Sequence, residues 1–405
     1  MFTSLKYREY RLFWIGAAFS NIGIWALLAG HLWLMHSMTG SGFMLGLLTL
    51  SSSGPMLLLS MWGGVLADRI NRLKLVTYSR ATFAVLALIT AVIIHYDLIQ
   101  PWHLIFLSTT YGILVAFDIP SRQAIVPNLV PAKHLLNAIV MYSFLMGGAN
   151  VIGPSISGPI IGIFGIEGLF FLVGASYIGT VFMLLRMKPI KQVYIKGNIR
   201  PIEDLLNGLR YIFENKPILI LILTGITTGI FGSSFGTLLP IIAKGNVQYF
   251  LNLQLSSGIG GLLGMVMLAY FGNVKNSIPT QISTGIGFGL CLAVFSQISW
   301  FPGSIAAIGL IGGLSVVFGT INNTLVQSLV SDKFRGRVMS IHQLSWGSSA
   351  IGGLMMGTMT EGIGATTTLL ICGITTATLV GILTVSSAQK LSDETKRSID
   401  DVINQ

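Results

Sequence analysis

The sequence predicts an all-α membrane protein with twelve transmembrane helices, and three observations carry this prediction. Hydrophobic residues make up 52% of the 405-residue chain and charged residues only 9%, whereas a soluble domain has about 25% charged residues. The apolar residues form runs long enough to cross a hydrocarbon layer of about 30 Å. Basic residues gather between these runs, which is typical of cytoplasmic loops.

The twelve apolar runs fall into two sets of six. They cover residues 12–36, 42–66, 73–95, 101–122, 133–163 and 166–186, and then 217–242, 246–272, 277–298, 302–330, 335–362 and 365–387. The first run is too long for a secretory signal, so we expect it to remain as the first helix. The sequence therefore predicts two pseudo-symmetric six-helix bundles, 1–186 and 217–389, with a cytoplasmic basic linker at 187–216 and a cytoplasmic tail at 390–405.

The distribution of basic residues predicts the orientation of the chain. With both termini in the cytoplasm, Lys244 is the only one of the 24 Lys and Arg residues placed on the outer side. A missed helix would invert every later loop and remove this asymmetry. We therefore expect a multi-pass protein of a bacterial cytoplasmic (inner) membrane.

The two halves also carry a faint internal repeat. Residues 124–133 align without gaps on 324–333, and the same offset of 200 pairs Gly153 with Gly353. Two halves of the same orientation imply an axis along the membrane normal and a central cavity between the halves.

Several function classes find no support in the sequence. It contains no G-x-x-x-x-G-K-[ST] loop for nucleotide phosphates and no G-x-S-x-G nucleophile elbow. Cys291 and Cys372 both lie in apolar runs, so a structural disulfide or metal site is not expected. We therefore expect no enzymatic activity, no cofactor, no metal and no nucleic-acid partner.

The loop after the second run carries the first mechanistic motif, which reads GGVLADRINRLK from Gly63 to Lys74. Asp68 stands there beside Arg69 and Arg72, an arrangement that can form a charge lock at a helix end. Arg335 and Arg337 in the second half either meet Asp68 or serve only to orient the protein. The loop resembles the G-x-L-a-D-r-x-g-r-[KR] pattern of the major facilitator superfamily, although asparagine replaces the usual glycine at position 71 and leucine replaces a base at 73.

Other segments narrow this resemblance to the enterobactin-exporter-like branch, which includes macrolide and tetracycline efflux relatives. They are Asn21 to Trp25, Thr39 to Ser41, Pro55, Asp118 to Gln123, and Arg335 to Ser340. The resemblance covers essentially the whole chain. It implies a transporter that exports an amphipathic small molecule by alternating access, driven by proton entry.

The fifth run contains a motif that is similar to the antiporter signature of exporters, G-P-x-x-G-G. Gly153, Pro154 and Gly158 belong to this segment, whereas Ser157 occupies the place of the first later glycine. The motif favours export over import, but the same small residues would also serve plain helix packing.

Asp118 and Arg122 form the candidate coupling pair, because an acid at membrane depth is costly and is usually paired or functional. The pair is either a proton-sensitive gate or a static ion pair at the interface, and Arg80 is either the true partner of Asp118 or a residue that snorkels inward. Pro120 is expected to make this turn irregular. His31 and His342 either titrate near neutral pH or serve as hydrogen-bonded packing residues.

Fold analogy supplies the candidate residues of the substrate cavity. They are Asn21, Trp25, Tyr111, Phe231, Phe235, Asn322, Asn323 and Trp346. Such a mixture of aromatic and amide groups suits an amphipathic or aromatic ligand, although each residue taken alone could equally be a packing residue.

The leading hypothesis is a proton-coupled exporter (antiporter) of an amphipathic small molecule such as a siderophore or drug. The partners would be that substrate, protons and the lipid bilayer, and the carrier would work as a monomer. The alternatives are an importer or a lysophospholipid flippase on the same fold, and a membrane sensor that does not transport.

Overall fold

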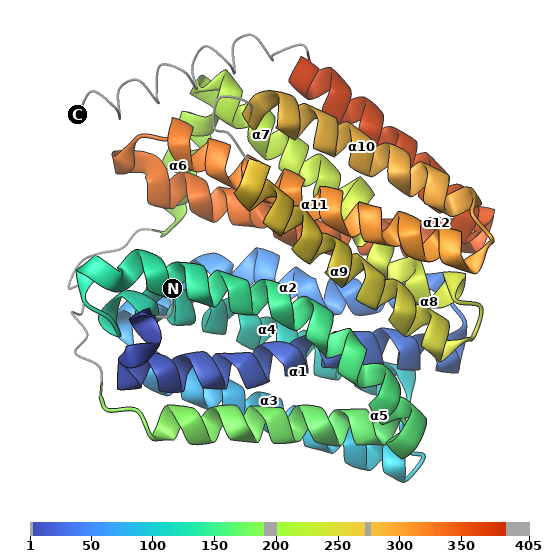
Figure 1. Ribbon diagram of the computed structural model, residues 1–405, viewed down its shortest axis with the longest axis horizontal. Coiled ribbons are helices and arrows are strands. Elements are labelled where there is room, and N and C mark those ends of the chain that lie inside the picture. Colours follow the sequence, from blue (N-terminus) through green and yellow to red (C-terminus); the bar gives the residue numbers. More distant parts are fainter. Residues whose placement is uncertain (1–2, 190–200, 272–276, 386–405) are drawn as a thin grey trace. The chain divides into compact units, whose positions relative to one another are not determined.

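The computed structural model describes residues 3–189, 201–271 and 277–385, and within them the chain forms helices and no strand (Figure 1). The first half contains η1 (Thr3–Lys6), α1 (Arg8–Thr39), α2 (Gly42–Arg69), α3 (Arg72–His95), α4 (Pro101–Ile125), η2 (Val126–Asn128), η3 (Ala132–His134) and α5 (Leu135–Leu185). The second half contains α6 (Pro201–Glu214), α7 (Lys216–Thr227), η4 (Thr228–Gly232), η5 (Ser233–Leu238), α8 (Leu239–Ile242), α9 (Val247–Phe271), α10 (Ser277–Gln297), α11 (Phe301–Leu329) and α12 (Asp332–Val385).

Two very long helices each contain two membrane passes. α5 is interrupted at Gly165 (φ 71°) and α12 at Gly364 (φ 78°), which are left-handed conformations that glycine adopts without a Cβ clash. In the described chain, 10 helices are long and apolar enough to cross a membrane. When α5 and α12 are each divided at their glycine, twelve passes result, and the prediction of an all-α, twelve-helix fold is confirmed.

The seventh pass is not one regular helix. α7 ends at Thr227, a π-helical turn (η4) and a 3-10 segment (η5) follow, and regular geometry returns only in α8. Gly225, Gly229, Gly232 and Gly236 lie in or beside this stretch, and glycine stabilises a helix less than other residues apart from proline. The apolar run predicted the pass correctly but not its irregular middle.

Residues of the chain cluster into two compact units. The first comprises residues 1–40, 51–199 and 243–255, and the second comprises 41–50, 200–242 and 256–405. The beginning of α2 thus belongs to the second unit and the beginning of α9 to the first. The predicted linker includes residues 190–200 and the predicted tail is 390–405, and both of these segments lie outside the described residues.

Each unit is held together by close helix packing. In the first unit, α1 and α3 pack against α5 (Figure 1), and the buried Tyr10 hydroxyl donates a hydrogen bond to the carbonyl of Ala138 at 2.7 Å. In the second unit, α10 packs against α11 and α12. Glycine pairs allow the closest approaches in this unit, because a Cβ at Gly260 of α9 would clash with the carbonyl of Gly309 in α11.

This packing predicts that Gly260→Ala destabilises the protein, because the added methyl group meets fixed backbone of α11. Overpacking of this kind costs about 1–3 kcal/mol. Gly287→Ala is the matched control in the same unit, since its Cβ would meet Leu314 at an ordinary 3.6 Å. Thermal unfolding of the purified variants in detergent measures the difference. Equal melting temperatures for the two variants would contradict the packing account.

Candidate functional site

A buried ionic cluster joins α3 and α4 in the first unit. Arg80 Nη2 and Arg122 Nε both donate to the same oxygen of Asp118, Oδ2, each at 2.6 Å. Arg80 and Asp118 are each 1% exposed and Arg122 is 6% exposed. The structure thus pairs Asp118 with both candidate partners rather than with one of them.

The local sequence of α4 positions two of these groups. Asp118 and Arg122 are four residues apart, so they lie on one face of a helix. Pro120 lies between them and cannot donate a backbone hydrogen bond to the carbonyl of Ala116. The helix nevertheless continues to Ile125, and the ion pair spans the proline.

Tyrosine and phenylalanine side chains surround the cluster. Arg122 Nη1 donates to the hydroxyl of Tyr142 on α5 at 2.6 Å. The Arg80 guanidinium lies 5.5 Å from the ring centre of Phe83 and 5.7 Å from that of Tyr177, distances at which a cation is attracted to an aromatic face. Tyr111 completes the shell, with its ring 4.7 Å from Phe83. In this conformation Tyr111, expected in the cavity, is a buried neighbour of the ionic cluster.

The cluster holds two positive charges and one negative charge. Among the residues that the structure describes, Asp118 Oδ1 and Arg80 Nε have no hydrogen-bond partner. Removing one partner of a buried ion pair leaves an uncompensated charge, at a cost of about 3–5 kcal/mol. Any event that neutralises Asp118 would therefore weaken the ion pair that Arg80 of α3 makes with α4, and the cluster can act as a lock between these helices.

The loop between α2 and α3 is described only in part. The side chains of Asp68 and Arg69 lie outside the described residues, as does that of Arg335, so the lock between the halves stays a prediction. Arg72 Nη1 donates to the carbonyl of Ala124 at 3.2 Å. Asn71, which replaces the glycine of the family pattern, caps α3 by accepting a hydrogen bond from the backbone of Lys74 at 3.1 Å.

The glycine motif of α5 supports close packing in the first unit. A Cβ at Gly153 would stand 2.6 Å from Cβ of Trp25 on α1, and a Cβ at Gly158 would stand 3.5 Å from the side chain of Gln248. The side chain of Pro154 lies outside the described part of the chain. Trp25 is half-buried at this contact, and the buried Asn21 amide donates to its own helix, at the carbonyl of Ala17.

The candidate cavity residues of the second unit lie on α11 and the irregular seventh pass. Asn322 is buried and donates to the carbonyl of Leu221 at 3.0 Å, while Asn323 is half-buried. Phe231 lies half-buried in η4 and Phe235 is buried in η5. Arg337 places its guanidinium 5.7 Å from the ring of Phe334. The Trp346 side chain is not among those described, and the roles of all these residues stay predictions.

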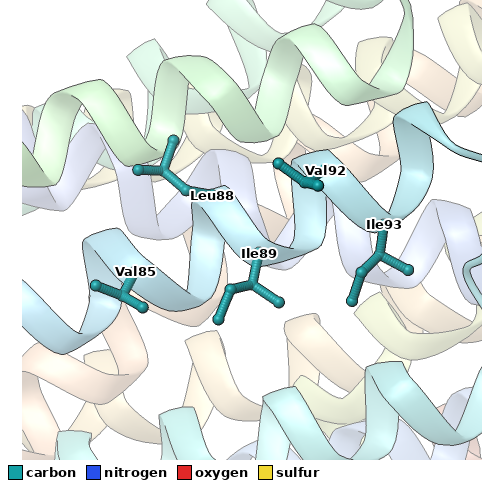
Figure 2. Close-up of a pocket in the computed structure, with 5 residues that line it drawn as sticks. All are labelled: Val85, Leu88, Ile89, Val92 and Ile93. Carbon is teal, nitrogen blue, oxygen red and sulfur yellow. The ribbon is translucent and has the colours of Figure 1, made fainter.

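An apolar pocket of about 290 Å³ lies along α3 (Figure 2). Its lining consists of Val85, Leu88, Ile89, Val92 and Ile93. All five side chains are aliphatic and come from one helix, so no polar group is present to orient a ligand. This surface suits the acyl chains of surrounding lipid better than it suits a transported substrate.

Comparison with known proteins decides the family. The family model described as transmembrane secretion effector matches residues 1–402. The chain belongs to this family. It is thus a multi-pass transporter of the efflux branch of the major facilitator superfamily, not an enzyme, and the resemblance drawn from its motifs is confirmed.

Curated relatives match most of the chain. A staphyloferrin A transporter of Staphylococcus aureus is 27% identical over 365 residues, which cover 88% of this chain and 90% of that protein. An enterobactin exporter of Escherichia coli is 26% identical over 344 residues, covering 81% and 78%. A macrolide efflux protein of Streptococcus pyogenes is 22% identical over 350 residues, covering 83% and 86%.

Solved structures share the fold. A peptide transporter of the POT family has a TM-score of 0.76 at 11% identity, with 95% of each chain covered. A nucleoside transporter has a TM-score of 0.73 at 13% identity, with 92% of this chain and 98% of that chain covered. At such low identity the likeness shows the fold alone.

Sequence reasoning did not find Tyr142 and Tyr177 as members of the ionic cluster. Tyr177 gives no sequence signal, because an aromatic residue in an apolar run is ordinary. Tyr142 could have been found, since the offset of 200 pairs it with His342, a polar residue at the same place of the second half.

The geometry predicts that Tyr142→Phe lowers the stability of the protein, because the Arg122 guanidinium loses a buried hydrogen-bond partner. A hydrogen bond to a charged group contributes about 1.5–3 kcal/mol. Tyr78→Phe, at a side chain that is 69% exposed, is the control. Melting temperatures of the two purified variants give the comparison, and a Tyr142 variant as stable as the control would show that this bond does not stabilise the cluster.

Proposed function

We propose that the protein is a proton-coupled exporter (antiporter) of an amphipathic small molecule such as a siderophore or drug, working by alternating access as a monomer. The observation that carries the proposal is the carboxylate of Asp118, buried between Arg80 and Arg122. A proton bound there would neutralise the one negative charge of the described cluster. Both ion pairs would weaken together.

Proton binding at this place would be coupled to helix movement through the geometry of the cluster. Arg80 comes from α3, Asp118 and Arg122 from α4, and Tyr142 from α5. A carrier needs a group whose proton affinity differs between its two conformations. Separation of these helices would change the surroundings of Asp118 and so change its affinity for a proton.

The relatives support the direction of transport and the class of substrate. Their names refer to a staphyloferrin transporter, a macrolide efflux protein and an enterobactin exporter. We extend this to export of a siderophore-like or drug-like molecule by this chain, in a bacterial cytoplasmic membrane with both termini in the cytoplasm. The substrate would bind in a cavity lined by the candidate residues of α1, α4, η4, η5, α11 and α12.

Untargeted mass spectrometry of culture medium tests the proposal. Cells expressing the parent chain are compared with cells expressing Asp68→Asn at the same protein level, because the proposed lock at Asp68 is needed for alternating access. A compound enriched outside only with the parent establishes export and identifies a substrate. Depletion of a compound from the medium, or no difference at all, would contradict export and favour import, lipid movement or a non-transporting role.

Asp118→Asn is expected to abolish pH-driven transport of that substrate while the protein still folds. The amide is close in shape to the protonated acid and can still accept a hydrogen bond, but it cannot exchange a proton. Asp97→Asn is the control, because Asp97 is exposed and lies at a φ of 54° that asparagine also adopts. Transport is measured in everted vesicles with and without a pH gradient. If Asp118→Asn keeps the response to the gradient, Asp118 is not the coupling group.

A further inference from the structure

The internal repeat places a hydrogen-bonded polar pair at the same position in both halves. The offset of 200 pairs Arg122 with Asn322 and Tyr142 with His342. In the first unit Arg122 donates to Tyr142 at 2.6 Å, and in the second His342 Nε2 lies 2.8 Å from Asn322 Oδ1. Both halves thus contain a hydrogen bond between the same two positions. In the first half the pair includes the permanent charge of Arg122, and in the second it includes the imidazole of His342.

The hydrogen bonds of Asn322 define the protonation of His342. The Asn322 amide nitrogen donates to the carbonyl of Leu221 at 3.0 Å and lies 3.3 Å from the hydroxyl of Thr224. Its oxygen must therefore accept from His342, so Nε2 of the imidazole carries the hydrogen. In this neutral tautomer Nδ1 is the basic nitrogen, and a proton can bind there without breaking the bond to Asn322.

In the described part of the chain, no acidic side chain of α12 or of the elements packed against it is buried. His342 is 4% exposed and Asn322 2% exposed. In the described part of α12 and of the elements packed around it, the other titratable or charged groups are Lys216 of α7, Cys291 of α10, Glu203, Arg210, Tyr211 and Glu214 of α6, and Arg337, Glu361 and Cys372 of α12 itself. The described residues of α7, η4, η5 and α11 include no acid, and the carboxylates of Glu203, Glu214 and Glu361 belong to exposed residues. An imidazolium would therefore be costly while the helices stay packed.

α12 meets the seventh pass through small residues, with a Cβ at Gly225 standing 3.0 Å from the Ser345 hydroxyl. That hydroxyl has no hydrogen-bond partner in the described chain. The π turn η4 begins four residues after Thr224, and such turns often occur at functional sites. The bond between Asn322 and His342 joins α11 to α12, and Asn322 connects both helices to α7 through the carbonyl of Leu221.

We infer that His342 is the proton-binding site of the C-terminal half. It binds a proton at Nδ1 when α12 shifts away from α7 and water reaches the ring, and it releases the proton when it packs beside Asn322 again. Neither member of the matching pair can play this part in the first half, because the guanidinium of Arg122 stays protonated and the phenol of Tyr142 has no basic nitrogen. The inference rests on the proposed function, since the proton bound here is one that drives export.

Nuclear magnetic resonance of the full chain in nanodiscs, with ¹⁵N-labelled histidine, tests the inference without a substrate. The chain has 6 histidines. The His342 signal is assigned from His342→Gln, and also by elimination through single glutamine variants of the other histidines, so a poorly folded variant does not stop the experiment. We expect a neutral Nε2–H ring at the alkaline end of the range of about pH 5–8 and an imidazolium at the acidic end.

Asn322→Asp supplies the second arm, because a carboxylate beside His342 stabilises the imidazolium. In this variant the titration midpoint of His342 is expected to rise by about one pH unit, which is a tenfold change in proton affinity. The exposed His95 serves as the internal control and should keep its midpoint. A His342 ring that stays neutral across the range, or a midpoint unmoved by Asn322→Asp, would overturn the inference. Titration of His342 in a chain that exports nothing would leave the proton site in place and refute the proposed function instead.

Discussion

Among the ion pairs that the structure describes, those of Asp118 are the ones with both partners buried, and they tie the helices of the first unit together. A buried carboxylate is costly unless it is paired, and this one is paired twice through a single oxygen, with Arg80 and Arg122. The position of α3 is thereby tied to that of α4, and Tyr142 extends the tie to α5. The same few side chains thus stabilise the packed bundle and include the carboxylate whose protonation would loosen it.

Glycine determines where the remaining helices can approach and turn. Gly165 and Gly364 divide two long helices into pairs of passes, and they lie 199 residues apart, close to the offset of the repeat. Gly260 and Gly153 allow backbones or side chains of neighbouring helices to meet closely. Because small residues rather than interlocking large side chains form these contacts, we expect them to restrain the sliding of one helix along another less than a core of large side chains would.

The sequence alone predicted the twelve membrane passes and the resemblance to efflux transporters, because the length of apolar runs, the charge of loops and the motifs in loops are local properties. It was also sufficient to single out Asp118, Arg122 and Arg80, since charges in apolar runs are rare. It could not choose between Arg80 and Arg122 as the partner of Asp118, nor place Tyr177 beside Arg80, because those contacts depend on how helices rotate against each other. The irregular geometry of η4 and η5 depends on packing against α12 and was not predictable from an apolar run.

The most direct test of the central claim is infrared difference spectroscopy of the purified protein between an alkaline and an acidic buffer in which the protein stays folded. The account predicts a carbonyl band of a protonated, buried carboxylic acid that appears on acidification, is lost in Asp118→Asn and persists in Asp97→Asn. Identical difference spectra for the parent and Asp118→Asn would contradict it, because Asp118 would then not be the carboxylate that takes up the proton.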